Sequence, residues 1–210
     1  MDTSAPRRYD SVSSRGITWL ERCLWAVSLF LLGYCVFLWG RAEFDQIQGN
    51  LLLDELLRRP ERVTTPQTDP SEGALFGRIE IPRLDLDAVV FEGTSDGTLA
   101  RGVGHLTHSA GPGGRGNVVL AGHRDTFFRQ LKGIRDGDVV TLTTPAGTFR
   151  YAVESTKVVE PTATEVLHTS PDATLTLITC YPFTFIGSAP ERFIVRGKRI
   201  GSISPGDGRT

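Results

Sequence analysis

The sequence predicts an all-β domain, folded as a closed and mostly antiparallel barrel, behind one N-terminal membrane-spanning helix. Two observations predict this architecture. Residues 74–200 contain seven short segments rich in β-branched residues and separated by turn residues, and residues 23–40 carry no charge. Short strands with few helical patterns between them are typical of barrels. The fold class by itself implies no function.

The uncharged run of residues 23–40 is long enough to cross a bilayer. As a helix it measures about 27 Å, close to the roughly 30 Å of a hydrocarbon core. Trp25 and Trp39 lie near its ends, and four arginines precede it. The positive-inside rule therefore places residues 1–22 in the cytoplasm and the chain after residue 41 outside. A cleaved signal peptide is the alternative, because Gly40-Arg41-Ala42 resembles a small-x-small cleavage site.

Residues 41–73 are expected to join the anchor to the outer domain. The apolar spacing in residues 42–59 favours a juxtamembrane amphipathic helix, either a plain stalk or a partner-binding helix, and Pro60 ends it. The Pro- and Thr-rich remainder is a linker. We expect the tail, residues 201–210, to be disordered. The net charge of −1 provides no basic field for nucleic acid.

The outer domain is predicted as strands joined by turns and short helical segments. The expected strands are residues 75–81, 88–92, 117–123, 138–143, 148–159, 174–180 and 192–200. Helical turns are expected at residues 125–131 and 163–168. The glycine-rich segment 111–116 is a loop without the Lys-Ser/Thr pair of a phosphate-binding loop.

Cys180 is the only cysteine of the outer domain, so it has no partner there for a disulfide. A lone cysteine is either a small buried hydrophobe or a nucleophile. His123 and Arg192 lie at the ends of other expected strands. Histidine can move a proton near neutral pH, and arginine presents a fixed fork of donors to a developing oxyanion. The three residues form a plausible site for covalent acyl transfer.

These segments resemble the sortases, which are membrane-anchored cysteine transpeptidases. Thr176-Leu177-Ile178-Thr179-Cys180 matches the family motif Thr-Leu-x-Thr-Cys, His123 follows Ala-Gly as in the family, and Arg192 lies on the strand after the cysteine. The resemblance implies an eight-stranded sortase barrel over residues 74–200, with Cys180 as nucleophile, His123 as acid and base, and Arg192 as substrate and oxyanion stabiliser. Ala-Gly-His-Arg-Asp-Thr-Phe-Phe is most similar to class D and related Gram-negative sortases.

The resemblance also implies the substrates and the location. We expect cleavage of a C-terminal sorting signal of the Leu-Pro-x-Thr-Gly or -Ala type, through a thioester, and transfer to an amine. The acceptor is either a cell-envelope peptide or a lysine of a pilus subunit. The enzyme is expected in the cell membrane with its catalytic domain outside. The alternatives are a cysteine endopeptidase, in which water resolves the thioester, and an inactive envelope scaffold.

Two further residues are predicted to bind substrate. Thr179 is expected to line the groove beside the thiol, with an inward orientation as its alternative, and His105 is expected to border the groove. Asp125 is interpreted as a helix cap in preference to a partner of His123. Arg196 is the rival of Arg192, because both lie on one face of a strand.

No metal site and no obligatory cofactor are predicted. His105 and His108 form His-x-x-His, but they lie in a segment that reads as a loop. Some sortases bind calcium through loop carboxylates, whereas Glu154, Glu160 and Glu165 are scattered here. Calcium stimulation is therefore not predicted.

Overall fold

A computed structural model describes residues 18–37, 51, 71–185 and 187–203, which fall into two units. The first unit contains the helix Thr18–Phe37, whose 20 residues have a mean hydropathy of 1.6 and are long and apolar enough to cross a membrane. This helix starts five residues before the expected anchor, residues 23–40, and its expected last turn lies outside the described residues. The predicted cytoplasmic residues before 18 and the juxtamembrane helix at 42–59 also lie outside them, apart from Leu51.

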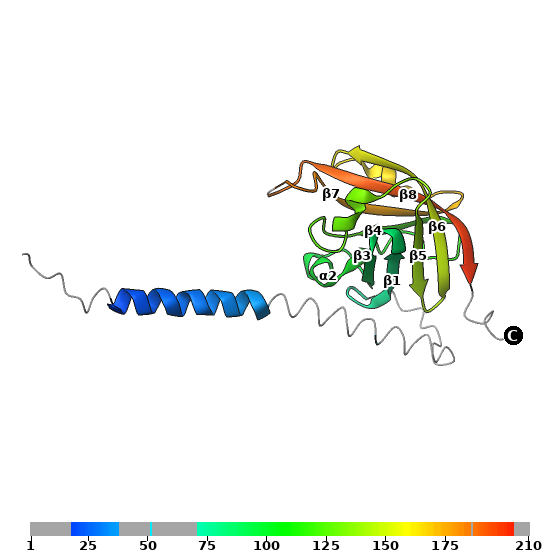
Figure 1. The fold of residues 1–210 in the computed structure, drawn as a ribbon. Helices are drawn as coiled ribbons and strands as arrows, with labels where there is room; N and C mark the ends of the chain where they lie inside the picture. Colours follow the sequence, from blue (N-terminus) through cyan, green and yellow to red (C-terminus); the bar gives the residue numbers. More distant parts are fainter. Residues whose placement is uncertain (1–17, 38–50, 52–70, 186, 204–210) are drawn as a thin grey trace, which may run out of the picture. The chain divides into compact units, whose positions relative to one another are not determined.

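The second unit is a closed barrel of eight strands, which confirms the predicted fold class (Figure 1). The strands follow the order β1-β2-β3-β4-β7-β8-β6-β5 around the barrel. β2/β3 and β4/β7 pair in parallel, and the other neighbours pair antiparallel. The strands are β1 Leu75–Ile81, β2 Leu86–Glu92, β3 Val103–His105, β4 Gly116–Ala121, β5 Val139–Thr144, β6 Gly147–Val159, β7 Ala173–Tyr181 and β8 Glu191–Ile203.

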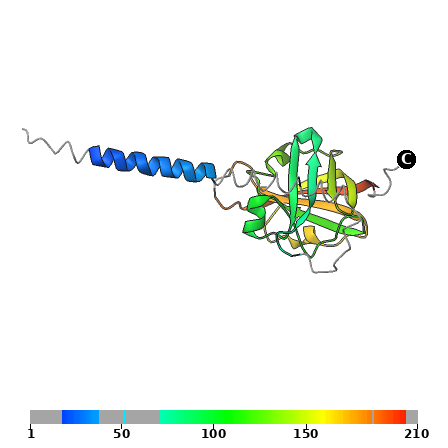
Figure 2. The ribbon, with the colours of Figure 1, turned by 90° about the horizontal axis from the view of Figure 1, so that it is seen from below.

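Four short helical elements lie between the strands, outside the barrel wall (Figure 2). They are η2 Pro82–Leu84, α2 Asp96–Arg101, η3 Arg129–Gly133 and η4 Thr164–Leu167. α2 begins where the Ser95 side chain accepts a hydrogen bond from the Thr98 backbone N–H. The sequence did not predict α2 or β3. β8 also continues to Ile203, three residues into the tail that was expected to be disordered.

Alternating side chains fill the interior of the barrel. On β7, Leu175 and Leu177 are each 1% exposed and belong to the main apolar cluster, whereas Ile178 and Cys180 are only partly buried. Successive residues of a strand point to opposite faces. Cys180 therefore lies on the outer face of the barrel wall, above an interior whose buried aliphatic side chains stabilise the fold by about 1.5–3 kcal/mol each.

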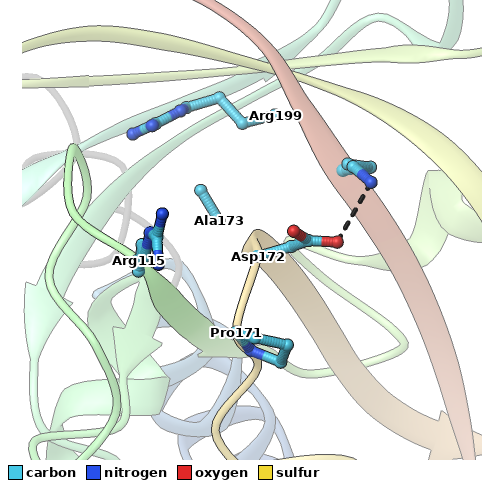
Figure 3. Close-up of a pocket in the computed structure, with 6 residues that line it drawn as sticks. Arg115, Pro171, Asp172, Ala173 and Arg199 are labelled. Carbon is cyan, nitrogen blue, oxygen red and sulfur yellow. Dashed lines mark hydrogen bonds and ion pairs between the residues drawn. The ribbon is translucent and has the colours of Figure 1, made fainter.

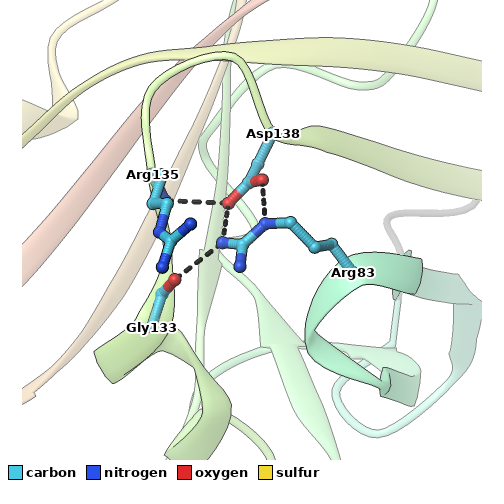
Figure 4. Close-up of polar contacts among 4 residues, drawn as sticks. All are labelled: Arg83, Gly133, Arg135 and Asp138. Atoms are coloured by element: carbon cyan, nitrogen blue, oxygen red, sulfur yellow. Dashed lines mark hydrogen bonds and ion pairs between the residues drawn. The ribbon is translucent and has the colours of Figure 1, made fainter.

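A buried carboxylate ties η2 to the start of β5 (Figure 4). Arg83 donates to both carboxylate oxygens of Asp138 at 2.5 Å and to the Gly133 carbonyl at 2.6 Å. Asp138 also accepts the Arg135 backbone N–H at 2.8 Å. The hydrogen bond from Arg83 is the main cause that lowers the pKa of Asp138. This network fixes the Gly133 end of η3.

Candidate active site

Cys180 and Arg192 lie directly opposite each other on the antiparallel strands β7 and β8. Opposite residues share a face of the sheet, with Cβ atoms about 4.5–5.5 Å apart. Both residues are partly buried. Nη1 of Arg192 donates to the carbonyls of Glu191, at 3.0 Å, and Ala189, at 3.3 Å, which holds the guanidinium at the base of the loop between the two strands. The rival arginine, Arg196, lies opposite Thr176, four residues away along β7.

His123 follows β4, the other neighbour of β7. The parallel pairing of β4 with β7 places Ala121 beside Ile178, and the Gly122 N–H extends it by donating to the Ile178 carbonyl at 3.1 Å. When this register is continued by two residues on each chain segment, His123 comes beside Cys180. The His123 side chain is exposed. His123, Cys180 and Arg192 therefore form one row, across the turn after β4 and the strands β7 and β8.

Hydrogen bonds to the carbonyls of Gly122 and His123 fix the backbone that carries the histidine of this row. The Thr179 hydroxyl donates to the Gly122 carbonyl at 2.7 Å, and the Phe128 N–H donates to the His123 carbonyl at 3.0 Å. A Cβ at Gly122 would lie 2.8 Å from the ring of Phe128, so this position must be glycine. The chain can therefore turn tightly after β4 and bring an exposed histidine beside the cysteine.

Thr179 takes the inward orientation that was the alternative to lining the groove. Its side chain is 2% exposed, and its hydroxyl is used by the bond to Gly122. Asp125 caps no helix, because the nearest element, η3, begins at Arg129 with Phe128 at its N-cap. The helix-cap interpretation of Asp125 was therefore wrong.

His105 lies on β3 and is 4% exposed. Its Nδ1 is 2.9 Å from Glu92 Oε2, its Nε2 is 3.0 Å from Ser109 Oγ, and its ring stacks on Phe76 with centroids 4.0 Å apart. These contacts engage both ring nitrogens and one face of the ring. Such burial favours a structural role over the expected contact with substrate, which stays a prediction.

A hollow of about 190 Å³ opens beside Arg192 on the same outer face. Ile178 and Ile194 form its floor, and Val166 and Leu167 from η4 form part of its wall. Ile178 precedes Cys180 by two residues and points to the same side of the strand. The hollow therefore adjoins the row formed by His123, Cys180 and Arg192, and its apolar lining can hold a small aliphatic side chain.

No pattern in the sequence singles out Arg124. Its Nη2 donates to the carbonyls of Phe185, at 2.6 Å, and Gly187, at 2.9 Å, and its guanidinium lies 5.9 Å from the centre of the Phe185 ring. The residue after His123 therefore holds the loop that joins Cys180 to Arg192. A contact between residues 61 positions apart leaves no local pattern in the sequence.

Comparison with known proteins decides the family. A model of the sortase domain matches residues 79–200, and sortase D of Bacillus subtilis is 32% identical over 83% of this chain and 98% of its own length. The chain belongs to the sortase family. The barrel is similar to a sortase D5 transpeptidase of Clostridium perfringens (TM-score 0.64, 24% identity, 77% of this chain and 99% of that one). It is also similar to sortase C-1 of Actinomyces oris (TM-score 0.57, 33% identity, 64% and 76%).

Family membership confirms the enzyme class expected from the motifs. Sortases are cysteine transpeptidases that act on proteins carrying a sorting signal, and they are associated with membranes. The helix Thr18–Phe37 is a possible span. The roles of individual residues in this sortase rest on the geometry described above.

Proposed function

We propose that this sortase cleaves a C-terminal sorting signal of the Leu-Pro-x-Thr-Gly or -Ala type and joins the threonine to an amine. The observation that carries the proposal is the pairing of Cys180 opposite Arg192, with His123 just past the end of the neighbouring strand β4. This row brings a nucleophile, a proton carrier and an oxyanion donor to one face of the sheet. The apolar hollow beside Arg192 is suited to the leucine and proline of such a signal.

In the first half of the reaction, the Cys180 thiolate attacks the carbonyl carbon of the signal's threonine. The carbonyl oxygen becomes an oxyanion, to which Arg192 donates. When the intermediate collapses, the peptide bond to glycine or alanine breaks, and the protonated His123 gives its proton to the leaving amine. The products are a thioester on Cys180 and a free C-terminal fragment.

In the second half, an amine attacks the thioester carbon. His123, now neutral, takes a proton from the amine, and Cys180 leaves as the thiolate. A new amide bond replaces the thioester, and the enzyme returns to its starting state. The acceptor is an amine of the cell envelope or a lysine of a pilus subunit, and the reaction needs no metal in either half.

We further propose that the helix Thr18–Phe37 anchors the enzyme with its N-terminus in the cytoplasm and its barrel outside. The arginines before this helix support that orientation. Protease added to intact cells should remove the barrel and leave the helix in the membrane fraction. A soluble form that begins near residue 43 would instead mean that a signal peptide is cleaved.

The test uses the full chain in neutral detergent with a library of sorting-signal peptides and a small amine. Mass spectrometry should find peptides cut after threonine and joined to the amine, and hydroxylamine should release a threonine hydroxamate. Cys180→Ala should form neither product. If only hydrolysed peptide appears at every amine concentration, the protein is an endopeptidase. If Cys180 reacts with no substrate-mimic electrophile and no peptide is cut, it is a scaffold.

A further inference from the structure

A polar hollow of about 360 Å³ lies at the far end of the strands that carry the candidate active site. It is lined by Arg115, Pro171, Asp172, Ala173, Lys198 and Arg199 (Figure 3). Ala173 begins β7, seven residues before Cys180, which separates the hollow from the thiol by about 23 Å along the strand. A ligand in this hollow is therefore remote from the reacting atoms.

The charge of the hollow is positive and comes from its arginines. Lys198 is neutralised, because its ammonium lies 3.0 Å from the carboxylate of Asp172, and their hydrogen bond raises the pKa of Lys198. Arg115 and Arg199 have no such partner: within residues 71–185 and 187–203 no ion pair joins either of them to a carboxylate. Figure 3 shows both arginine side chains extending to the same side of the hollow, next to Ala173.

The glycine-rich loop, residues 111–116, carries Arg115 and accepts hydrogen bonds from Arg199. Nη1 of Arg199 donates to the loop carbonyls of Gly113, at 2.6 Å, and Gly114, at 3.3 Å. Gly113 has φ +99° and its Cβ would lie 3.0 Å from the Phe149 ring, so a side chain there is strained. Gly116 has φ +119°, with the same consequence. Arg115 lies in this loop between Gly113 and Gly116, and Arg199 is bonded to the loop.

We propose that this hollow binds a phosphate group. Two guanidinium forks offer more donors than the two oxygens of one carboxylate can accept, whereas the three or four oxygens of a phosphate can engage both. Arginine forks also match the spacing of phosphate oxygens in a bidentate contact. The glycine-rich loop contributes Arg115 to this site and accepts hydrogen bonds from Arg199, and it lacks the lysine motif of a nucleotide-binding loop.

The first test is calorimetric titration of the full chain in neutral detergent with inorganic pyrophosphate. Arg115→Ala should weaken binding about tenfold, because it removes a charge-assisted contact. Asp172→Asn should tighten binding about threefold, because it removes the carboxylate that repels the ligand. Arg129→Ala, on the exposed surface of η3, should leave the affinity unchanged. Cys180→Ala should bind as the wild type does, so the result is independent of the transpeptidase reaction.

Thermal unfolding of each variant checks that a loss of binding is not a loss of fold. Arg115→Lys keeps the charge without the fork and should bind with intermediate affinity. In nanodiscs, equal pyrophosphate affinity with phosphatidylcholine and phosphatidylglycerol assigns a soluble phosphate as ligand, whereas competition by phosphatidylglycerol assigns a lipid headgroup. No heat of binding up to 10 mM pyrophosphate, or equal weakening by Arg115→Ala and Arg129→Ala, would overturn the proposal.

Discussion

Thr179 donates a hydrogen bond of 2.7 Å to the carbonyl of Gly122, so the residue before Cys180 holds the residue before His123. This bond is buried, and it crosses from β7 to the turn that follows β4. The position of the thiol relative to the imidazole is therefore fixed by a buried hydrogen bond between two groups that do not take part in the proposed reaction.

Thr179→Val should lower the rate of acyl transfer while the barrel remains folded. Valine keeps the shape of the side chain but leaves the Gly122 carbonyl without its donor, which typically costs about 1–3 kcal/mol. We expect kcat to fall about tenfold with KM little changed, because binding does not depend on where the imidazole sits. Steady-state kinetics of Thr179→Val and Thr179→Ser check this. If the hydroxyl is what matters, Thr179→Ser must restore kcat. A serine variant as slow as the valine variant would contradict the prediction.

His123→Ala should reduce turnover by about 10²–10⁴-fold, because it removes the group that carries the proton in both halves of the reaction. His168→Ala is the matched control, since His168 is also exposed and lies after η4, outside the row. Its rate should match that of the wild type in the same peptide assay. Equal damage from the two substitutions would mean that the wrong histidine has been assigned.

Arg192→Lys should lose about 10²–10³-fold in kcat and retain substrate binding, because a donor to the oxyanion acts mainly in the transition state. Lysine keeps the charge but lacks the fork. Arg196→Lys should be nearly silent, because Arg196 faces Thr176 and not the thiol. Single-turnover rates of thioester formation distinguish the two, and a larger loss at Arg196 than at Arg192 would reverse the assignment.

Arg124→Lys should change the balance between transfer and hydrolysis. Both carbonyls, of Phe185 and Gly187, accept from the single nitrogen Nη2 of Arg124, and the lysine side chain is one bond too short to place its nitrogen there, so the loop between Cys180 and Arg192 loses its restraint. We expect more water to reach the thioester and the ratio of hydrolysed to aminolysed product to rise several-fold. Product ratios at a fixed amine concentration measure it. Arg129→Lys is the control, and an unchanged ratio in Arg124→Lys would argue that the loop needs no such contact.

Asp138→Asn should lower the melting temperature by about 5 °C at neutral pH, because the carboxylate is 7% exposed and accepts from Arg83 and Arg135. The pKa of Asp138 is lowered in the folded state. The stability that Asp138 contributes is therefore complete above its unfolded-state pKa, near 3.9. It is lost as the pH falls through the lower pKa of the folded state. Melting curves from pH 7 to 3 should show the two proteins converging in acid. Asp172→Asn, in an exposed pair, should change little.

The sequence predicts the long strands well and the short elements poorly. β1 and β7 show alternation over seven and nine residues, and their observed bounds match the prediction to within one residue at each end. β3 has three residues with Gly104 at its centre, too few to show a period. α2 has six residues, and its N-terminus is held partly by the Glu72 carboxylate, which accepts from the Ser95 N–H from 23 residues upstream. Neither β3 nor α2 can therefore be recognised from its own residues alone.

The same limit applies to the candidate site. The motifs indicate Cys180, His123 and Arg192, because each lies at the end of a recognisable strand. The direction of Thr179 could not be read from its strand, since both faces of β7 carry buried residues such as Thr176 and Leu177. The burial of His105 depends on Glu92 and Ser109, which reach it from other parts of the chain.

β8 is the last strand of the barrel, and it pairs with both β6 and β7. β7 and β6 are not hydrogen-bonded to each other, so β8 is the strand that closes the ring between them. Arg192 is the second residue of that strand, so the proposed oxyanion donor takes its place opposite the thiol when β8 joins the wall. A nascent or C-terminally shortened chain that ends before β8 carries the cysteine and the histidine but has no complete site. Under the proposed mechanism, catalytic competence therefore requires that the last strand of the barrel is in place.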